Sequence, residues 1–206
     1  SARRAEWEAR FRALGATPDA TPWDEAAMTA TLARVRPDAV FALLGTTRKR
    51  AAEAARRDGA DASYEAVDYG LTMRLHRAAS RAARDTGHAP RFVYLSAVGV
   101  GPSARGAYLA VRWRAEREIA AGALPWTVAR PSFITGPDRA ESRPAERLGA
   151  AVTDALLAPL RRLGATRPLA DRYRSTTADE LAAALVRLAA DPAAAGRVVE
   201  GDGLRG

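Results

Sequence analysis

Three short apolar runs constrain the fold of this chain more than any other feature of its sequence. They read DAVFALL at residues 38–44, RFVYL at 91–95 and WTVA at 126–129. Runs of about four to eight residues that are apolar on both faces are typical of strands buried in a parallel sheet. Stretches with helical spacing of apolar side chains separate these runs. The alternation predicts an α/β fold with a doubly wound parallel sheet.

Helical patterns cover most of the remaining sequence, at residues 1–14, 23–35, 62–87, 145–163 and 175–191, and a further helix carries Tyr108. The longest should end at Gly87, because a glycine commonly closes a helix, and its expected inward stripe is Val67, Leu71, Leu75 and Ala78. Residues 196–203 supply a last strand, and Pro131 interrupts the third strand because it has no N–H for the ladder. The chain has no repeat or linker, so we expect one domain over residues 1–206.

The composition excludes several classes of function. No apolar run approaches the roughly eighteen residues that a membrane helix requires, so no membrane span is expected. The chain has no cysteine, which excludes disulfides and thiolate metal sites and favours a cytoplasmic location. The two histidines, His76 and His88, lie in no metal-binding motif, so we expect no metal site.

The net charge of +8 raises the question of nucleic acid as a partner. Every basic residue except Lys49 is an arginine, and alanine is abundant, as in proteins from GC-rich bacterial genomes. The arginines are interleaved with acids, for example in WRAERE at residues 113–118, which indicates a solvated helix face. Nucleic-acid binding is therefore the least favoured function.

Small and hydroxyl-bearing residues follow each of the three strands. In an open parallel sheet, ligands bind beyond the carboxyl ends of the strands. Small residues are common at any single strand-to-helix turn, but three such turns together favour a ligand site. The residues at these turns are Gly45, Thr46 and Thr47, then Ser96 and Ala97, then Arg130, Pro131 and Ser132.

Several segments occur in an order that resembles a known family: LLGTTRKRA, VDY, RFVYLSAVG, YLAVRWRAERE and ARPSFITGPDRAESRP. From about Asp38 to Leu148 the chain resembles the atypical short-chain dehydrogenases, and among them the group related to the Tat-interacting protein, an NADPH-binding oxidoreductase-like protein. The resemblance implies a single Rossmann-like domain that binds NADP or NAD. Some members of the family are dehydrogenases or reductases, and others act as binding proteins.

The resemblance also implies roles for three residues around the Tyr108 helix. Tyr108 would be the catalytic acid/base, Arg112 its electrostatic support, and Ser96 the residue that orients the substrate. A spacing of four places Tyr108 and Arg112 on one helix face, where the cation should lower the pKa of the phenol. The family normally has lysine at the position of Arg112, and a second hydroxyl residue where this chain has Ala97. Both departures leave open a protein that binds the dinucleotide but no longer turns over.

The remaining implied contacts concern the cofactor. Gly45, Thr46 and Thr47 would line its ribose and phosphates. Arg130, Pro131 and Ser132 would flank the nicotinamide, and Asp19 would lie near the adenine. No glycine-rich G-x-G-x-x-G turn precedes the first apolar run, since that spacing occurs only in GDGLRG at residues 201–206, so we expect the chain to lack the first strand and turn of the fold, as a sequence truncated at its N-terminus. The expected partners are the dinucleotide and a small carbonyl or alcohol, and the sequence leaves open whether the chain forms a homodimer.

Overall fold

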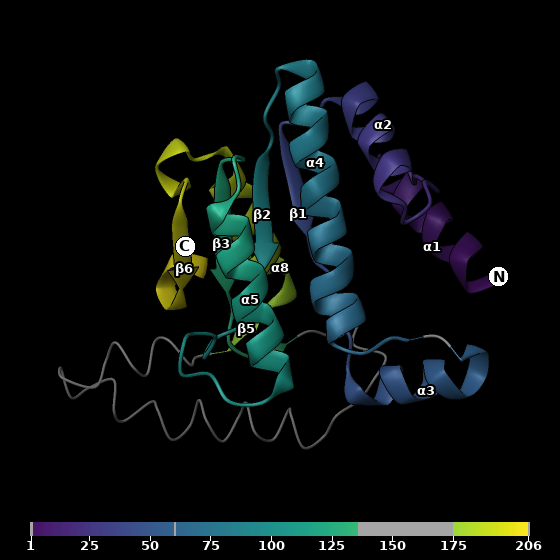
Figure 1. The fold of residues 1–206 in the computed structure, drawn as a ribbon, viewed down its shortest axis with the longest axis vertical. Helices are drawn as coiled ribbons and strands as arrows, with labels where there is room; N and C mark the ends of the chain where they lie inside the picture. The colour runs from purple at the N-terminus through teal and green to yellow at the C-terminus, as the bar shows by residue number, and fades with distance from the viewer. Residues whose placement is uncertain (1, 60, 136–174, 206) are drawn as a thin grey trace.

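The computed structural model describes residues 2–59, 61–135 and 175–205, and its centre is a four-stranded parallel sheet (Figure 1). The strands lie in the order β1, β2, β3 and β6, which span Ala39–Ala42, Arg91–Leu95, Trp126–Arg130 and Arg197–Glu200. Tyr94 in β2 pairs with Ala42 on one side and Val128 on the other. The three predicted parallel strands and the last strand are confirmed.

Helices connect the strands and flank the sheet. They are α1 (Ala2–Ala13), α2 (Glu25–Val35), α3 (Arg48–Asp58), α4 (Thr72–Thr86), α5 (Ala107–Ala121) and α8 (Ala178–Ala190). A π-helical segment, η1 (Glu65–Leu71), leads into α4, and the short 3-10 helices η2 (Pro192–Ala194) and η3 (Gly201–Leu204) flank β6. The helix predicted over residues 145–163 lies outside the described residues. Within them, no helix has the length and apolarity needed to cross a membrane.

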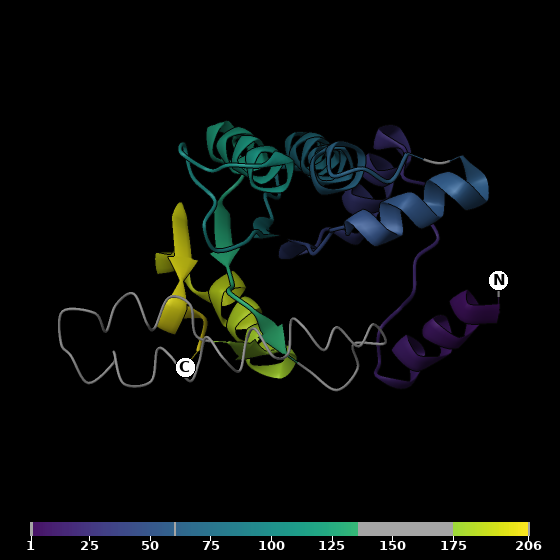
Figure 2. The same cartoon turned by 90° about the horizontal axis from the view of Figure 1, so that it is seen from below.

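Both faces of the sheet are covered by helices, as Figure 2 shows with α4 and α5 on one side and α8 on the other. Alternate side chains of β2 enter the two cores. Phe92 and Tyr94 pack with Met73 and Ile119 on the α4/α5 face. Val93 packs against α8 on the opposite face, with Leu185 among its neighbours. Full burial of each such side chain contributes about 1.5–3 kcal/mol. The doubly wound arrangement is therefore confirmed.

The third strand ends at the residue before Pro131, as the sequence predicts. β3 ends at Arg130, and Pro131 follows it. The chain then forms β4 (Ile134–Thr135), which pairs in parallel with β5 (Thr176–Thr177) as a second small sheet. At the other side of the main sheet, β1 pairs with β2 alone among the described residues, and Phe41 remains 36% exposed.

The segment before α4 differs from the sequence-based expectation. In η1 the Tyr69 N–H bonds to the Tyr64 carbonyl, five residues earlier, which adds one residue to the turn. The extra residue rotates the inward face. Of the predicted stripe only Ala78 is buried, and the other three members are half-buried: Val67, Leu71 and Leu75. The side chains that are buried instead include three polar ones: Asp68, Thr72 and His76.

Candidate active site

Arg112, on the inward face of α5, joins the carboxyl ends of two strands. Its side chain is only 5% exposed. Nη1 donates to the Leu95 carbonyl at 2.6 Å, at the end of β2. Nη2 donates to the Leu44 carbonyl after β1 at 3.3 Å, and to Asp68 Oδ1 at 2.7 Å. The guanidinium, a planar group with several donors, can reach all three acceptors at once.

Asp68 completes this arrangement from the π-helical turn. The side chain is fully buried, and its Oδ2 accepts the Thr46 N–H at 3.0 Å. Burial raises the pKa of this carboxyl, and the Arg112 charge acts in the opposite direction. A Cβ atom at Gly45 would lie 3.0 Å from Arg112 Nη2, so a larger residue there would displace the guanidinium by a few tenths of an ångström. Asp68 lies in the VDY segment of the resemblance but was not among the predicted site residues.

Tyr108 is half-buried in the first turn of α5 and lies at the outer end of this cluster. Its ring lies 5.2 Å from that of Tyr64, and the Arg112 guanidinium carbon lies 4.8 Å from the ring centroid, a cation–π distance. Burial raises the pKa of the Tyr108 phenol, and Arg112 lowers it by less. Arg112 therefore acts on the pKa of Tyr108 in the expected direction, but the net shift is upward, because the cost of burying the phenolate exceeds the attraction of the cation.

A second buried network links Ser96 to the end of β3 through Glu116. Ser96 Oγ donates to Glu116 Oε1 at 2.5 Å. Arg130 donates two hydrogen bonds to the same carboxylate, from Nε to Oε1 at 3.0 Å and from Nη2 to Oε2 at 2.5 Å. Its Nη1 donates to Glu200 Oε1 at 2.9 Å. Glu116 is 4% exposed, although WRAERE was interpreted as a solvated face. The signal that could have identified it is its position four residues after Arg112, on the same face of α5.

The other predicted residues fall into two groups. At the strand ends, the Thr47 side chain accepts the Arg50 N–H and caps α3, the Pro131 carbonyl accepts the Val98 N–H at 2.9 Å, and Ser132 follows half-buried. Asp19 lies elsewhere, exposed in the loop between α1 and α2, where it accepts the Thr21 N–H. Asp19 thus contacts Thr21 and Arg34, neither of which joins it to the strand ends.

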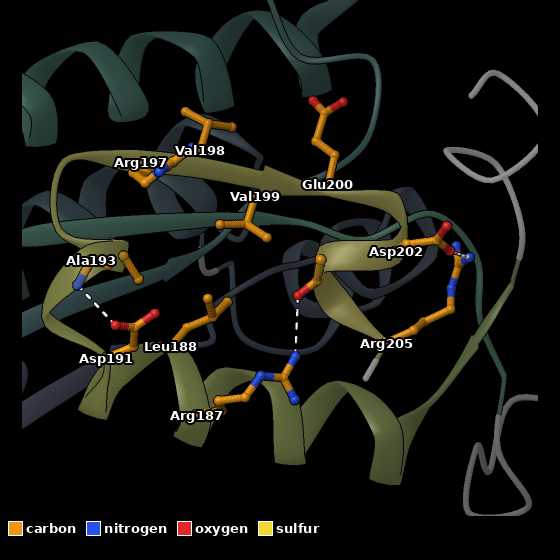
Figure 3. Close-up of a pocket in the computed structure, with 12 residues that line it drawn as sticks. Arg187, Leu188, Asp191, Ala193, Arg197, Val198, Val199, Glu200, Asp202 and Arg205 are labelled. Carbon is orange, nitrogen blue, oxygen red and sulfur yellow. Dashed lines mark hydrogen bonds and ion pairs between the residues drawn. The ribbon is translucent and has the colours of Figure 1, made fainter.

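A separate pocket of about 620 Å³ lies at the outer edge of β6 (Figure 3). Three arginines line it together with three acids: Arg187, Arg197 and Arg205 with Asp191, Glu200 and Asp202. Within it, Arg187 donates to the Gly203 carbonyl and Arg205 to Asp202. The pocket is thus lined by equal numbers of basic and acidic side chains, and none of the predicted site residues lines it.

Comparison with known proteins places the fold. No family model matches the sequence, and no curated protein matches it. RMD from Pseudomonas aeruginosa, solved with NADPH, superposes with a TM-score of 0.54 at 20% identity, over 85% of this chain and 64% of RMD. A short-chain dehydrogenase/reductase superfamily protein from Agrobacterium tumefaciens, with bound NAD, gives 0.55 at 18% identity, over 94% and 72%. WbmG from Bordetella bronchiseptica, with NAD, gives 0.53 at 12%, over 91% and 58%.

These similarities concern the fold. The described residues share the Rossmann-like fold of these three structures, as the resemblance in sequence implied. The chain spans less than two thirds of the length of RMD and of WbmG. At these identities the likeness concerns the fold, and the chemistry must be argued from the residues of this chain.

Proposed function

We propose that this chain is an NAD(P)-dependent oxidoreductase of the atypical short-chain type that acts on a small carbonyl or alcohol. The observation that carries the proposal is the placement of Tyr108 at the start of α5, against an arginine that is bonded to the ends of β1 and β2. Ligands of open α/β sheets bind at these strand ends. NADPH or NAD is bound in three solved structures of the same fold, which supports a dinucleotide as the cofactor.

The strand-end residues fit one half of a dinucleotide better than the other. Thr46 and Ser132 bring hydroxyls, and Gly45 leaves the backbone open, which suits a ribose and a nicotinamide ring. The buried arginines already face acids, Arg112 with Asp68 and Arg130 with Glu116 and Glu200, so their charges are not directed at a diphosphate. We propose that Gly45, Thr46 and Thr47 hold the nicotinamide ribose and adjoining phosphate, and that Arg130, Pro131 and Ser132 flank the ring.

The proposed chemistry needs one proton donor from the protein. When bound, the nicotinamide supplies or accepts the hydride. Because its pKa is raised by burial, Tyr108 keeps its proton at neutral pH and can donate it to a carbonyl oxygen. Ser96 already donates its proton to Glu116, so its oxygen offers lone pairs to a substrate hydroxyl. Tyr108 therefore suits reduction of a carbonyl to an alcohol, and Ser96 can accept a hydrogen bond from the hydroxyl of the alcohol.

The proposal is tested by titrating the full chain with NADPH and with NADH, followed by a screen of small carbonyls monitored through NADPH oxidation. We expect saturable binding, and turnover that falls by about a hundredfold or more in Tyr108→Phe. The two titrations also decide between NADP and NAD. Failure to bind either dinucleotide, or turnover unaffected by the phenylalanine, would refute the proposal.

A second candidate is a regulatory protein that binds the dinucleotide without turnover. The observation in its favour is that Arg112 directs its donors to two backbone carbonyls and to Asp68, whereas a lysine would present a compact ammonium. Ala97, in place of a second hydroxyl residue, also favours this candidate. Binding of NADPH without any turnover that depends on Tyr108 would favour this candidate.

Two further proposals concern the setting of the protein. The absence of cysteine supports a cytoplasmic location, and a homodimer is proposed as the assembly. Sedimentation velocity over a range of concentrations tests the second, since a dimer must dissociate on dilution or sediment at twice the mass of the chain.

A further inference from the structure

Asp68 makes two contacts that no other residue type of its size could make together. Oδ1 accepts from Arg112 Nη2 at 2.7 Å, and Oδ2 accepts from the Thr46 N–H at 3.0 Å. A carboxylate can accept on both oxygens, whereas an asparagine can accept on one only. The side chain is fully buried, so water does not compete for either contact.

The contacts of Asp68 and Arg112 hold three consecutive residues of the turn after β1. The Leu44 carbonyl accepts from Arg112, and the Thr46 N–H donates to Asp68. Between them, Gly45 lies so close to the guanidinium that a Cβ atom would be 3.0 Å from Nη2. The pair therefore fixes the backbone of residues 44–46 from both sides.

The same pair fixes the turn relative to the rest of the site. Arg112 also binds the Leu95 carbonyl at the end of β2, and its guanidinium stacks on Tyr108. The turn after β1, the end of β2 and the proposed proton donor thus share one buried cation. A turn ordered before a ligand arrives removes an ordering cost that binding would otherwise have to offset.

We infer that Asp68 is a positioning residue, which pins the Leu44–Thr46 turn through the Thr46 amide and Arg112 so that the turn can receive a nicotinamide dinucleotide. The inference rests on the proposed function for the identity of the ligand. The pinning of the turn is independent of the proposed function, because it can be measured without any ligand. Asp68 acts through Thr46 and Arg112 and is not itself assigned a contact with substrate.

The test compares Asp68→Asn with two controls in the full chain. Asp85→Asn removes an exposed acid from the same helix region. Leu185→Ala removes a buried side chain from the core on the opposite face and supplies a destabilised protein whose turn is intact. Amide hydrogen exchange at Thr46, followed by NMR, reports on the turn, and titration with NADPH and NADH reports on binding.

In Asp68→Asn we expect the Thr46 amide to exchange about tenfold faster or more, and the dinucleotide affinity to fall by a similar factor, since a hydrogen bond to a buried charge is lost. Both quantities should be unchanged in Asp85→Asn. In Leu185→Ala the melting temperature should fall, with affinity retained well below it. Arg112→Lys should behave like Asp68→Asn, because an ammonium cannot span the Leu44 and Leu95 carbonyls.

The outcomes separate this inference from the proposed function. Unchanged Thr46 exchange in Asp68→Asn overturns the pinning of the turn. Faster exchange with undiminished dinucleotide affinity overturns the positioning role. If the unaltered chain binds neither NADPH nor NADH, the proposed function fails together with the identity of the ligand, while the exchange rates still decide whether Asp68 pins the turn.

Discussion

Arg112 differs from a lysine in how many groups its side chain can join. A lysine ammonium four residues after the tyrosine would present one compact charge, whereas the guanidinium of Arg112 contacts two carbonyls, a carboxylate and the ring of Tyr108. This charge is largely matched by Asp68, 2.7 Å away. The arginine at this position therefore has a structural consequence: the cation holds the strand ends and only weakly favours the phenolate.

The state of Tyr108 gives the first prediction. Because burial raises the pKa of its phenol more than Arg112 lowers it, Tyr108 should keep its proton above pH 10, the usual pKa of tyrosine. Tyrosine carbon-13 NMR of the labelled protein measures this, with Tyr108→Phe identifying the resonance by its loss. Ionisation of Tyr108 near neutral pH would contradict the account and would restore Arg112 as an activating cation.

Glu116 gives the second. This second prediction concerns the variant Glu116→Gln, which removes the charge of Glu116. Arg130, which is 12% exposed, then faces one carboxylate in place of two. We expect the free energy of unfolding to fall by about 3 kcal/mol, measured by urea denaturation. Glu118→Gln is the matched control, because that acid lies two residues along the same helix but accepts a Tyr69 hydrogen bond at an exposed position. Its loss should cost less than about 1 kcal/mol, and equal losses in the two variants would contradict the buried network.

Among the elements, the pair η1 and α4 diverges most from the sequence pattern. The π-helical turn rotates the residues that the 3.6-residue period would bury away from the core. Three polar side chains are buried in their place: Asp68, Thr72 and His76. A π-helical turn depends on tertiary contacts, here those of Asp68 with Thr46 and Arg112, so a period counted within the helix could not predict it. The Gly87 end of α4, by contrast, is a local signal and was predicted.

Helix α3 differs from α4 in that its sequence has capping residues at both ends but no apolar stripe. It buries none of its described side chains, so a hydrophobic period could not predict it. Thr47 caps its first turn through the Arg50 N–H, and Gly59 closes it in the left-handed region at φ 64°. Capping residues alone would have located this element.

The buried face of α4 leads to the third prediction. His76 is 5% exposed, edge-on to Phe92, and so close to Gly122 that a Cβ there would lie 2.7 Å from its Cε1. Burial lowers the pKa of His76, and Arg77 acts in the same direction against Glu118. The unfolded chain therefore binds a proton before the folded one does, so stability should fall as the pH drops below about 6.5.

The measurement is the urea midpoint at about pH 7.5 and about pH 5, with His76→Leu as the comparison. The leucine variant should lose less stability between the two values than the unaltered protein. An equal loss in both would mean that other groups govern the acid side of the stability curve.

At the scale of the molecule, the topology was predictable and the buried charges were not. Three apolar runs separated by helical patterns predicted β1, β2 and β3 and their parallel direction, because strands covered on both faces carry a strong local signal. The strand-end residues Thr46 and Ser96 were predicted by the same topology. Of their partners, Asp68 could not be predicted, because it lies in a π-helical turn that depends on tertiary contacts, whereas Glu116 could have been identified from its position four residues after Arg112. The predicted contact of Asp19 has no support in the contacts of that residue.

The central claim is that the ends of β1, β2 and β3, with the start of α5, form one dinucleotide site. The most direct test is amide and aromatic NMR of the full chain during titration with NADPH. The account predicts that the largest shift changes fall on Gly45, Thr46, Ala97 and Ser132 and on the ring of Tyr108. Changes confined to other regions, or none at saturating NADPH, would contradict it.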